Sequence, residues 1–107
     1  MLSPAPAAAR KPEKAEEVVD LHYDKLSTIT GEHSNAEKLK LQLDTFEKQL
    51  ENAIAAGQHE VTFIHGTGSG VLREEIHRRL SKHDHVEYYK DARKEKFGYG
   101  ATYVKIK

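Results

Sequence analysis

The chain has 107 residues, which is enough for one domain with its own core but not for two. Hydrophobic residues make up 37% of it, charged residues make up 32%, and the formal net charge is zero. Cysteine is absent, which excludes disulfides, cysteine zinc sites and thiol catalysis. No apolar run approaches the roughly 20 residues of a membrane span or forms the core of a signal peptide, so we expect a cytoplasmic protein.

Charge is divided unevenly along the chain. Residues 1–65 carry 7 Lys and Arg against 11 Asp and Glu, a net of −4, and residues 66–107 carry 10 against 6, a net of +4. A basic face in the second half would bind a phosphate backbone despite the neutral total. An ordinary solvated surface would show the same imbalance, so charge alone leaves both interpretations open.

The N-terminal segment has a composition of its own. Residues 1–15 are rich in Pro, Ala, Lys and Glu and predict a flexible linker, followed by a folded domain over residues 16–107. A linker at the start of so short a chain indicates the terminal piece of a longer protein. The other domains of that parent chain would then be partners of this one.

The first ordered elements are a strand and a long helix. Glu17-Val18-Val19-Asp20-Leu21-His22 predicts a short strand that is buried on both faces. Ser34-Asn35-Ala36-Glu37 fits a capping box, in which the serine hydroxyl and the glutamate carboxylate each accept a backbone amide. An apolar stripe typical of one helix face follows, and Gly57 is placed to end the helix. The stripe consists of Leu39, Leu43, Phe46, Leu50 and Ile54.

A second strand and helix follow, and two strands close the chain. Residues 60–65 are rich in β-branched and aromatic residues and predict a strand. The glycine-rich residues 66–70, called the glycine loop below, lead directly into a helix with an apolar inner face. Residues 86–89 and 101–106 predict the closing strands, and a charged loop lies between them. The inner face of the second helix is formed by Leu72, Ile76 and Leu80.

The order of elements is therefore β-α-β-α-β-β. A helical crossover makes the first two strands parallel neighbours in one sheet. The expected fold class is α/β, a two-layer sandwich with a four-stranded mixed sheet and two helices. The pattern leaves strand order open, and the last two strands either form a hairpin or flank different strands.

The glycine loop is the strongest local signal for binding. Glycines at alternate positions let the backbone approach a ligand closely, and the helix N-terminus behind them attracts an anion such as phosphate. The loop lacks the Gly-Lys-Ser/Thr of a P-loop and the glycine spacing of a dinucleotide fingerprint. The alternative is a tight strand-to-helix turn that needs glycine only for its dihedral angles.

Titratable side chains are expected to meet beside this loop. Asp20 and His22 project to one side at the end of the first strand, and His65 ends the second. Parallel neighbours end at the same edge of a sheet, where open α/β folds bind ligands. A carboxylate beside a histidine orients the imidazole and stabilises its charged form, as acid–base chemistry requires. We expect Asp20, His22 and His65 to be catalytic.

Three further patterns carry less weight. His83-Asp84-His85 has metal-ligand residue types, but two alternating histidines without a third ligand seldom hold a metal, so we interpret it as a turn. The sequence shows no required cofactor and leaves a divalent metal open. The remaining histidines, His33, His59 and His77, are interpreted as surface residues.

Basic and aromatic residues alternate near the last loop. This pattern favours either a basic aromatic surface that holds a nucleic-acid strand or a solvated hairpin. The residues are Lys90, Arg93, Lys94 and Lys96, with Tyr88, Tyr89, Phe97 and Tyr99 among them.

Four segments, in order, resemble the Smr (small MutS-related) family. Val19-Asp20-Leu21-His22 resembles its Leu-Asp-x-His motif, and residues 65–70 match its His-Gly-x-Gly-x-Gly motif. Val71-Leu72-Arg73 resembles the family's helix start, and Gly98-Tyr99-Gly100-Ala101-Thr102 resembles its C-terminal Gly-x-Gly segment. The resemblance spans residues 17–107. It implies a fold similar to the C-terminal domain of bacterial translation initiation factor three.

The resemblance also implies a function. Family members include DNA-nicking and RNA-cleaving endonucleases, so DNA or RNA is the implied partner and the glycine loop would cradle a phosphate. Tyr23 stands where the family's first motif usually continues with glycine, which keeps two alternatives open: a nucleic-acid-binding module without cleavage, and a protein-interaction tail with a decayed site. The residues expected to contact nucleic acid are Gly66, Thr67, Gly68, Ser69, Gly70, Arg73, Lys94 and Lys96.

Overall fold

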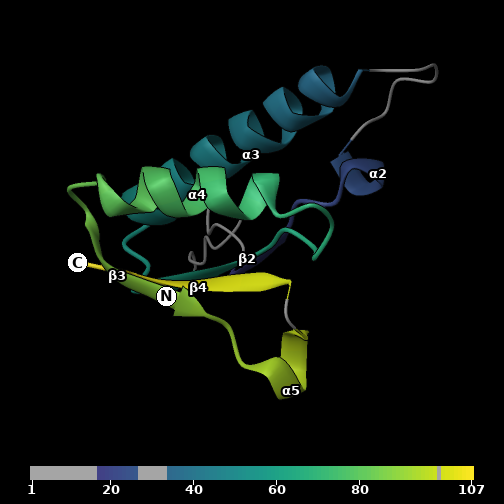
Figure 1. Ribbon diagram of the computed structural model, residues 1–107. Coiled ribbons are helices and arrows are strands. Elements are labelled where there is room, and N and C mark those ends of the chain that lie inside the picture. Colours follow the sequence, from purple (N-terminus) through teal and green to yellow (C-terminus); the bar gives the residue numbers. More distant parts are fainter. Residues whose placement is uncertain (1–16, 27–33, 99) are drawn as a thin grey trace, which may run out of the picture.

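A computed structural model describes residues 17–26, 34–98 and 100–107. Within these residues there are four strands and four helices, and Figure 1 labels them. The predicted linker over residues 1–15 lies outside the described residues, and so does His33. The strands are β1 (Val18–Asp20), β2 (Glu60–Ile64), β3 (Val86–Asp91) and β4 (Ala101–Ile106). The helices are α2 (Tyr23–Leu26), α3 (Asn35–Ala55), α4 (Val71–Ser81) and α5 (Lys94–Phe97).

The predicted α/β architecture is confirmed, with two short helices added. The sequence predicted only α3 and α4, whereas α2 and α5 have 4 residues each and are too short to display an apolar period. The first strand also ends earlier than predicted, at Asp20 rather than His22. The Asp20 carboxylate accepts the His22 amide at 2.9 Å, which turns the chain out of the sheet.

The sheet has the strand order β1-β2-β4-β3, which the sequence left open. β1 and β2 are parallel, as expected from the helical crossover between them. β4 pairs antiparallel with β2 on one side and with β3 on the other. The last two strands are therefore neighbours, and β4 is a central strand of the sheet.

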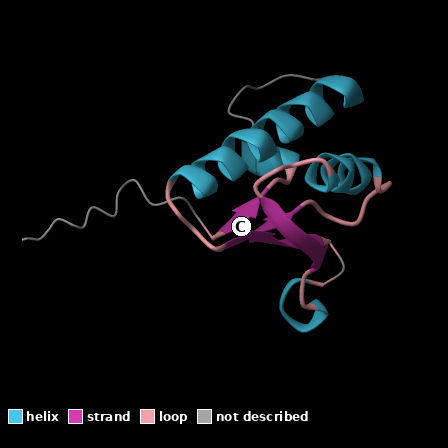
Figure 2. Cartoon of the chain, turned by 90° about the vertical axis from the view of Figure 1, so that its left-hand side faces the viewer, coloured by secondary structure: helices cyan, strands magenta, loops and turns pink. Residues whose placement is uncertain are grey.

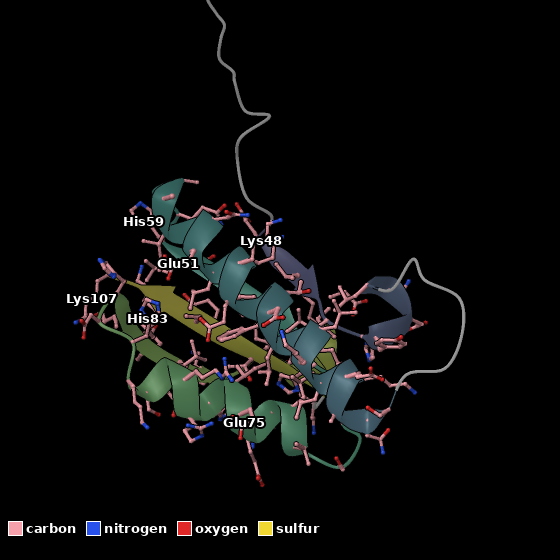
Figure 3. The ribbon with its side chains drawn as sticks, turned by 90° about the horizontal axis from the view of Figure 1, so that it is seen from above. Lys48, Glu51, His59, Glu75, His83 and Lys107 are labelled. Carbon is pink, nitrogen blue, oxygen red and sulfur yellow. The ribbon has the colours of Figure 1, made fainter. Side chains whose placement is uncertain are left out.

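Both long helices cover the same face of the sheet. Figures 1 and 2 show α3 and α4 on one side and α5 projecting beyond the opposite side. Seen from above in Figure 3, α3 and α4 lie side by side over the strands. Phe46 of α3 packs edge-on against Phe63 of β2, with ring centroids 4.8 Å apart. The fully buried core side chains include Leu21, Phe46, Leu50, Val61, Phe63, Ile76 and Val104.

The ends of α3 match the sequence signals. The capping box is present, with Ser34 Oγ accepting the Glu37 amide and Glu37 Oε1 accepting the Ser34 amide. Gly57 has a φ of 75° just after the helix ends. At the same end of the molecule His83 Nε2 lies 3.3 Å from Glu51 Oε2, and Figure 3 labels both. Among the helices of the described residues, none is long and apolar enough to cross a membrane.

Candidate active site

Asp20 and His22 form a hydrogen-bonded pair at the end of β1. Asp20 Oδ1 lies 2.7 Å from His22 Nδ1 and also accepts the His22 amide. Partial burial opposes ionisation of Asp20, but these hydrogen bonds outweigh it and hold the pKa of the carboxyl below its usual 3.8. Because a carboxylate accepts only, Nδ1 carries the proton and Nε2 is left for other chemistry. About half of the His22 side chain is exposed to solvent.

His22 lies directly against the start of the glycine loop. A Cβ added at Gly66 would lie 2.9 Å from His22 Nε2, and Gly66 has a φ of 81°. Both observations require glycine at this position. His22 Nε2 therefore lies beside the glycine loop, a proximity that the sequence predicted from the parallel pairing of β1 and β2.

The start of β4 closes the site from the other side. The Gly100 carbonyl accepts the amides of His65 and Gly66 at 2.8 and 2.9 Å. A Cβ at Gly100 would lie 2.9 Å from the Gly66 backbone, so only glycine fits between the two segments. The C-terminal Gly-x-Gly segment thus holds the glycine loop through backbone contact.

A cavity of about 500 Å³ opens beside the glycine loop, between the N-terminal parts of α3 and α4. Its basic groups are Lys38 of α3 and Arg73 of α4, and the ring of Tyr23 lies opposite with Lys38 Nζ 5.2 Å from the ring centroid. Gln42 also lines it and donates a hydrogen bond to the Leu21 carbonyl at 2.9 Å. The loop residues that line the cavity are Gly66, Gly68, Ser69 and Gly70, without Thr67.

His65 is buried beneath the glycine loop and bonded at both ring nitrogens. Nδ1 lies 2.9 Å from the Gly66 carbonyl, and Nε2 lies 2.9 Å from Thr102 Oγ1. On its other side Thr102 Oγ1 lies 2.8 Å from His77 Nε2. His77 was interpreted from sequence as a surface residue, and this was wrong, because its ring is partly buried against Tyr89 and bonded to Thr102.

This network fixes the proton on each ring. A carbonyl only accepts, so His65 donates from Nδ1 and accepts the Thr102 hydroxyl proton at Nε2. The same hydroxyl oxygen then accepts from His77 Nε2. Burial lowers the pKa of His65, and burial followed by the nearby Arg73 charge lowers that of His77, so both rings are neutral at pH 7.

The basic residues expected at the site are divided between two places. Arg73 lines the cavity and pairs with Asp91 at 2.8 Å, a hydrogen bond that lowers the pKa of Asp91. Lys94 and Lys96 belong to α5, which projects from the opposite side of the sheet in Figures 1 and 2. The structure therefore does not bring these two lysines to the cavity with the glycine loop.

The other histidine pattern forms a turn. His83 and His85 stack edge to face with ring centroids 5.9 Å apart, and His83 Nδ1 accepts the His85 amide. In the part of the chain that the structure describes, no group of three or more His, Asp or Glu side chains is placed to hold a metal ion.

Comparison with known proteins decides the family. A model of the Smr domain matches residues 33–107, more than half of the chain, including the glycine loop and the Gly98–Thr102 segment. The chain belongs to the Smr domain family. The matched part begins after the Asp20–His22 pair.

The Smr domain has relatives among much longer proteins. It is 43% identical to endonuclease MutS2 of Clostridium kluyveri over 61 residues, which is 57% of this chain and 8% of that protein. With endonuclease MutS2 of Lactococcus lactis it shares 35% identity over 71 residues, 66% of this chain and 9% of that protein. The chain thus spans less than a tenth of the length of these relatives.

Two solved structures have the same fold. The Smr domain of Thermus thermophilus MutS2 superimposes with a TM-score of 0.60 at 29% identity, covering 86% of this chain and 99% of that one. YdaL of Escherichia coli, a stand-alone small MutS-related protein, gives 0.58 at 26% identity, covering 85% and 64%. Both likenesses extend over most of the domain.

Three residues near the site were missed by sequence reasoning. Lys38 and Gln42 lie on the polar side of the first turns of α3, where a lysine or glutamine is ordinarily solvated. Their place at the cavity depends on how α3 packs beside the glycine loop, which is a tertiary property. His77 had a weak signal, since it lies one residue after the apolar Ile76 on α4.

Proposed function

We propose that this Smr domain is a nucleic-acid endonuclease whose Asp20–His22 pair transfers protons at a phosphodiester. The observation that carries the proposal is the 2.7 Å contact between Asp20 and His22 Nδ1, together with Nε2 placed against Gly66. A histidine that is oriented by a carboxylate and exposed beside a glycine-rich loop at a helix N-terminus has the features of a general base. Cleavage by MutS2 relatives is consistent with the proposal.

In the proposed reaction His22 Nε2 takes the proton of the attacking hydroxyl, from water or from a ribose, as its oxygen bonds to phosphorus. The Asp20 carboxylate stabilises the imidazolium that results. The bond from phosphorus to the leaving oxygen then breaks, and the imidazolium returns its proton to that oxygen. The amides of the glycine loop and the N-terminus of α4 would hold the phosphate oxygens.

We assign His65 a positioning role in place of the proton transfer that the sequence suggested. Both of its ring nitrogens are occupied, by the Gly66 carbonyl and by Thr102, and the ring is buried. If His65 were protonated at Nε2, that nitrogen could no longer accept the proton of the Thr102 hydroxyl, and this hydrogen bond would be lost. His65 therefore supports the glycine loop that faces His22.

Cleavage assays with labelled single- and double-stranded RNA and DNA test this function, each run in magnesium and in EDTA. We expect His22→Ala to lower the cleavage rate by about 10²-fold or more, as for loss of a general base. Asp20→Asn should lower it less, because asparagine still accepts a hydrogen bond but carries no charge. His59→Ala is the matched control, since His59 is exposed and only its backbone carbonyl is bonded.

An active enzyme that is indifferent to His22→Ala would remove the proposed mechanism. Circular dichroism of each variant should be unchanged, so that a loss of rate reflects chemistry and not unfolding.

A second candidate function is binding without cleavage. Tyr23 follows His22 directly and lines the cavity, where the family pattern has glycine. A ring at this position narrows the space for a nucleotide beside His22. Binding of an oligonucleotide by the parent chain with no cleavage, and cleavage gained in Tyr23→Gly, would support this second function over the first.

A further inference from the structure

The face of the sheet opposite α3 and α4, called the open face here, carries a row of aligned side chains. Val18 of β1 pairs with Thr62 of β2, Thr62 with Tyr103 of β4, and Tyr103 with Lys90 of β3. Side chains of paired residues project to the same face of a sheet. Since the neighbouring Val104 belongs to the core under the helices, the row lies on the other face.

The open face exposes aromatic and aliphatic surface. Val18 is 41% exposed and Tyr88 is 45% exposed, which makes them two of the three large exposed hydrophobic side chains of the described residues. Both line a groove of about 290 Å³ on this face. Tyr89, which the sequence grouped with Tyr88, faces the helices instead, where its hydroxyl lies 2.6 Å from Ser81 Oγ.

Two tyrosine rings form a fixed platform in this groove. The ring centroids of Tyr88 and Tyr103 lie 6.1 Å apart. Tyr103 donates a hydrogen bond from its hydroxyl to Glu60 Oε1 at 2.7 Å, which holds the ring in place and raises the pKa of the phenol. Rings that are already ordered bind a flat partner with little loss of side-chain entropy.

The groove is basic at one end. Lys90, Arg93 and Lys96 line it near α5, with Lys90 Nζ 5.6 Å from the centre of the Tyr103 ring. Neither Lys90 nor Arg93 has an ion pair with any described residue. Two acidic residues, Glu17 and Glu60, also line the groove, and Glu60 accepts the hydrogen bond from Tyr103.

The basic end of the groove lies at the edge of the sheet that also carries the candidate active site. Arg93 follows the end of β3, and β4 begins at that edge with Gly100 against Gly66. On β1 the exposed Val18 and the site residue Asp20 are two positions apart and therefore project to the same face, about 7 Å from one another. The groove residue Val18 and the site residue Asp20 are thus neighbours on the same face of β1.

We propose that the open face binds single-stranded nucleic acid, with bases stacked on Tyr88 and Tyr103 and phosphates at Lys90, Arg93 and Lys96. Exposed rings beside cationic side chains recognise unstacked bases joined by a charged backbone. A duplex keeps its bases stacked on one another and offers the rings no free base face. The proposal rests on the proposed function for the nature of the ligand, and it assigns Lys96 a binding surface distinct from the glycine loop.

Binding of labelled oligo(dT) and oligo(U) of about 10 nucleotides to the full chain tests the proposal. Tyr88→Ala should weaken binding by about 5- to 150-fold, the range of one lost base–aromatic stack. Tyr88→Phe should bind like the parent, because phenylalanine keeps the ring. Since the chain has no tryptophan, quenching of tyrosine fluorescence on binding reports the stacking directly, and it should diminish in Tyr88→Ala.

A matched pair of lysine variants tests the charge. Lys90→Ala should make the slope of log K against log salt shallower by about 0.7, the effect of one lost phosphate contact on a single strand. Lys48→Ala removes the same charge from an exposed position on α3, labelled in Figure 3, and should leave the slope unchanged. The two oligonucleotides distinguish DNA from RNA as the preferred strand.

Parent binding that persists in Tyr88→Ala and Lys90→Ala would overturn the open-face proposal and leave the proposed function standing. Failure of the parent to bind or cleave any nucleic acid would overturn both. A change of self-association in Tyr88→Ala, measured by sedimentation with nucleic-acid binding intact, would show that the face contacts protein and would also overturn the proposal.

Discussion

His65 and His77 differ from His22 in the work that their rings do. They are buried or partly buried, share the Thr102 hydroxyl, and have lowered pKa values because burial disfavours their charged forms. His22 is exposed and bonded to a carboxylate. Three histidines close to one loop thus divide into two that are held in a hydrogen-bond network beneath it and one that is open to solvent.

The buried pair should make stability depend on pH. A histidine whose folded pKa lies below its unfolded value of 6.5 takes up its proton more readily when the chain unfolds. The free energy of unfolding is therefore at its full value above about pH 6.5 and falls as the pH drops towards the folded pKa values. Urea unfolding at about pH 7.5 and about pH 5.5 measures the difference.

A His65→Gln, His77→Gln double variant provides the comparison. It lacks the two rings whose pKa values burial lowers, so its free energy of unfolding should change less between the two pH values. The carboxylates with lowered pKa, Asp20 and Asp91, lose their contribution to stability only below about pH 3.8, as the pH falls towards their folded pKa values, and this lies outside the window. If the free energy of unfolding had the same pH dependence in the parent and in the double variant, the assignment of neutral rings to His65 and His77 would be wrong.

Between elements, the glycine loop depends on backbone contact with β4. A Cβ at Gly100 would meet the Gly66 backbone at 2.9 Å, and backbone atoms cannot rotate away. We expect Gly100→Ala to lower the free energy of unfolding by about 1–3 kcal/mol, as for an overpacked site. Urea unfolding measures the loss, and cleavage or binding should fall with it.

Gly68→Ala is the matched change within the glycine loop itself. A Cβ at Gly68 would have nothing within 4 Å. Its stability should stay within about 0.5 kcal/mol of the parent. If both alanine variants unfolded at the same urea concentration, the close approach of Gly100 to the Gly66 backbone would not limit the size of the residue at position 100.

The elements that sequence predicted are those with a local signature. The capping box at Ser34, the apolar stripe of α3 and the strand-to-helix glycine loop were all readable, because each depends on residues close together in the chain. The helices α2 and α5 were not predicted, since four residues are too few to show a helical period of apolar side chains. The bulge of β3 between Val86 and Tyr88 was also hidden, and it decides which tyrosine faces the open side.

For the whole molecule, the convergence of Asp20, His22 and Gly66 was predictable because parallel strands end at one edge. The positions of Lys94 and Lys96 were not, since a basic loop after β3 could fold toward either face of the sheet. The network of His65, Thr102 and His77 joins β2, β4 and α4, and no local pattern connects these segments.

The uneven distribution of charge along the chain should govern its binding of nucleic acid. With net zero charge, affinity for nucleic acid must come from local contacts in the basic second half. For about 3 neutralised phosphates, the slope of log K against log salt should be roughly −2 to −3. Titrations of a labelled single strand at several salt concentrations measure it.

A double variant shows where these contacts lie. Arg73→Ala, at the cavity, combined with Lys90→Ala, on the open face, should weaken binding and make the slope of log K against log salt shallower. Lys48→Ala with Lys82→Ala removes the same charge from exposed positions on the helical side and should do neither. If the slope of log K against log salt were near zero in the parent, binding would not depend on contacts with phosphates.

The central place of β4 also sets an order of events during synthesis. β4 follows every other strand of the sheet in the sequence, so the ribosome produces β2 and β3 before the strand that joins them. Until then β3 has no partner in the sheet, and the Gly100 carbonyl that holds the glycine loop has not been made. A nascent chain therefore completes the surroundings of the glycine loop only when β4 has been made and the sheet is whole.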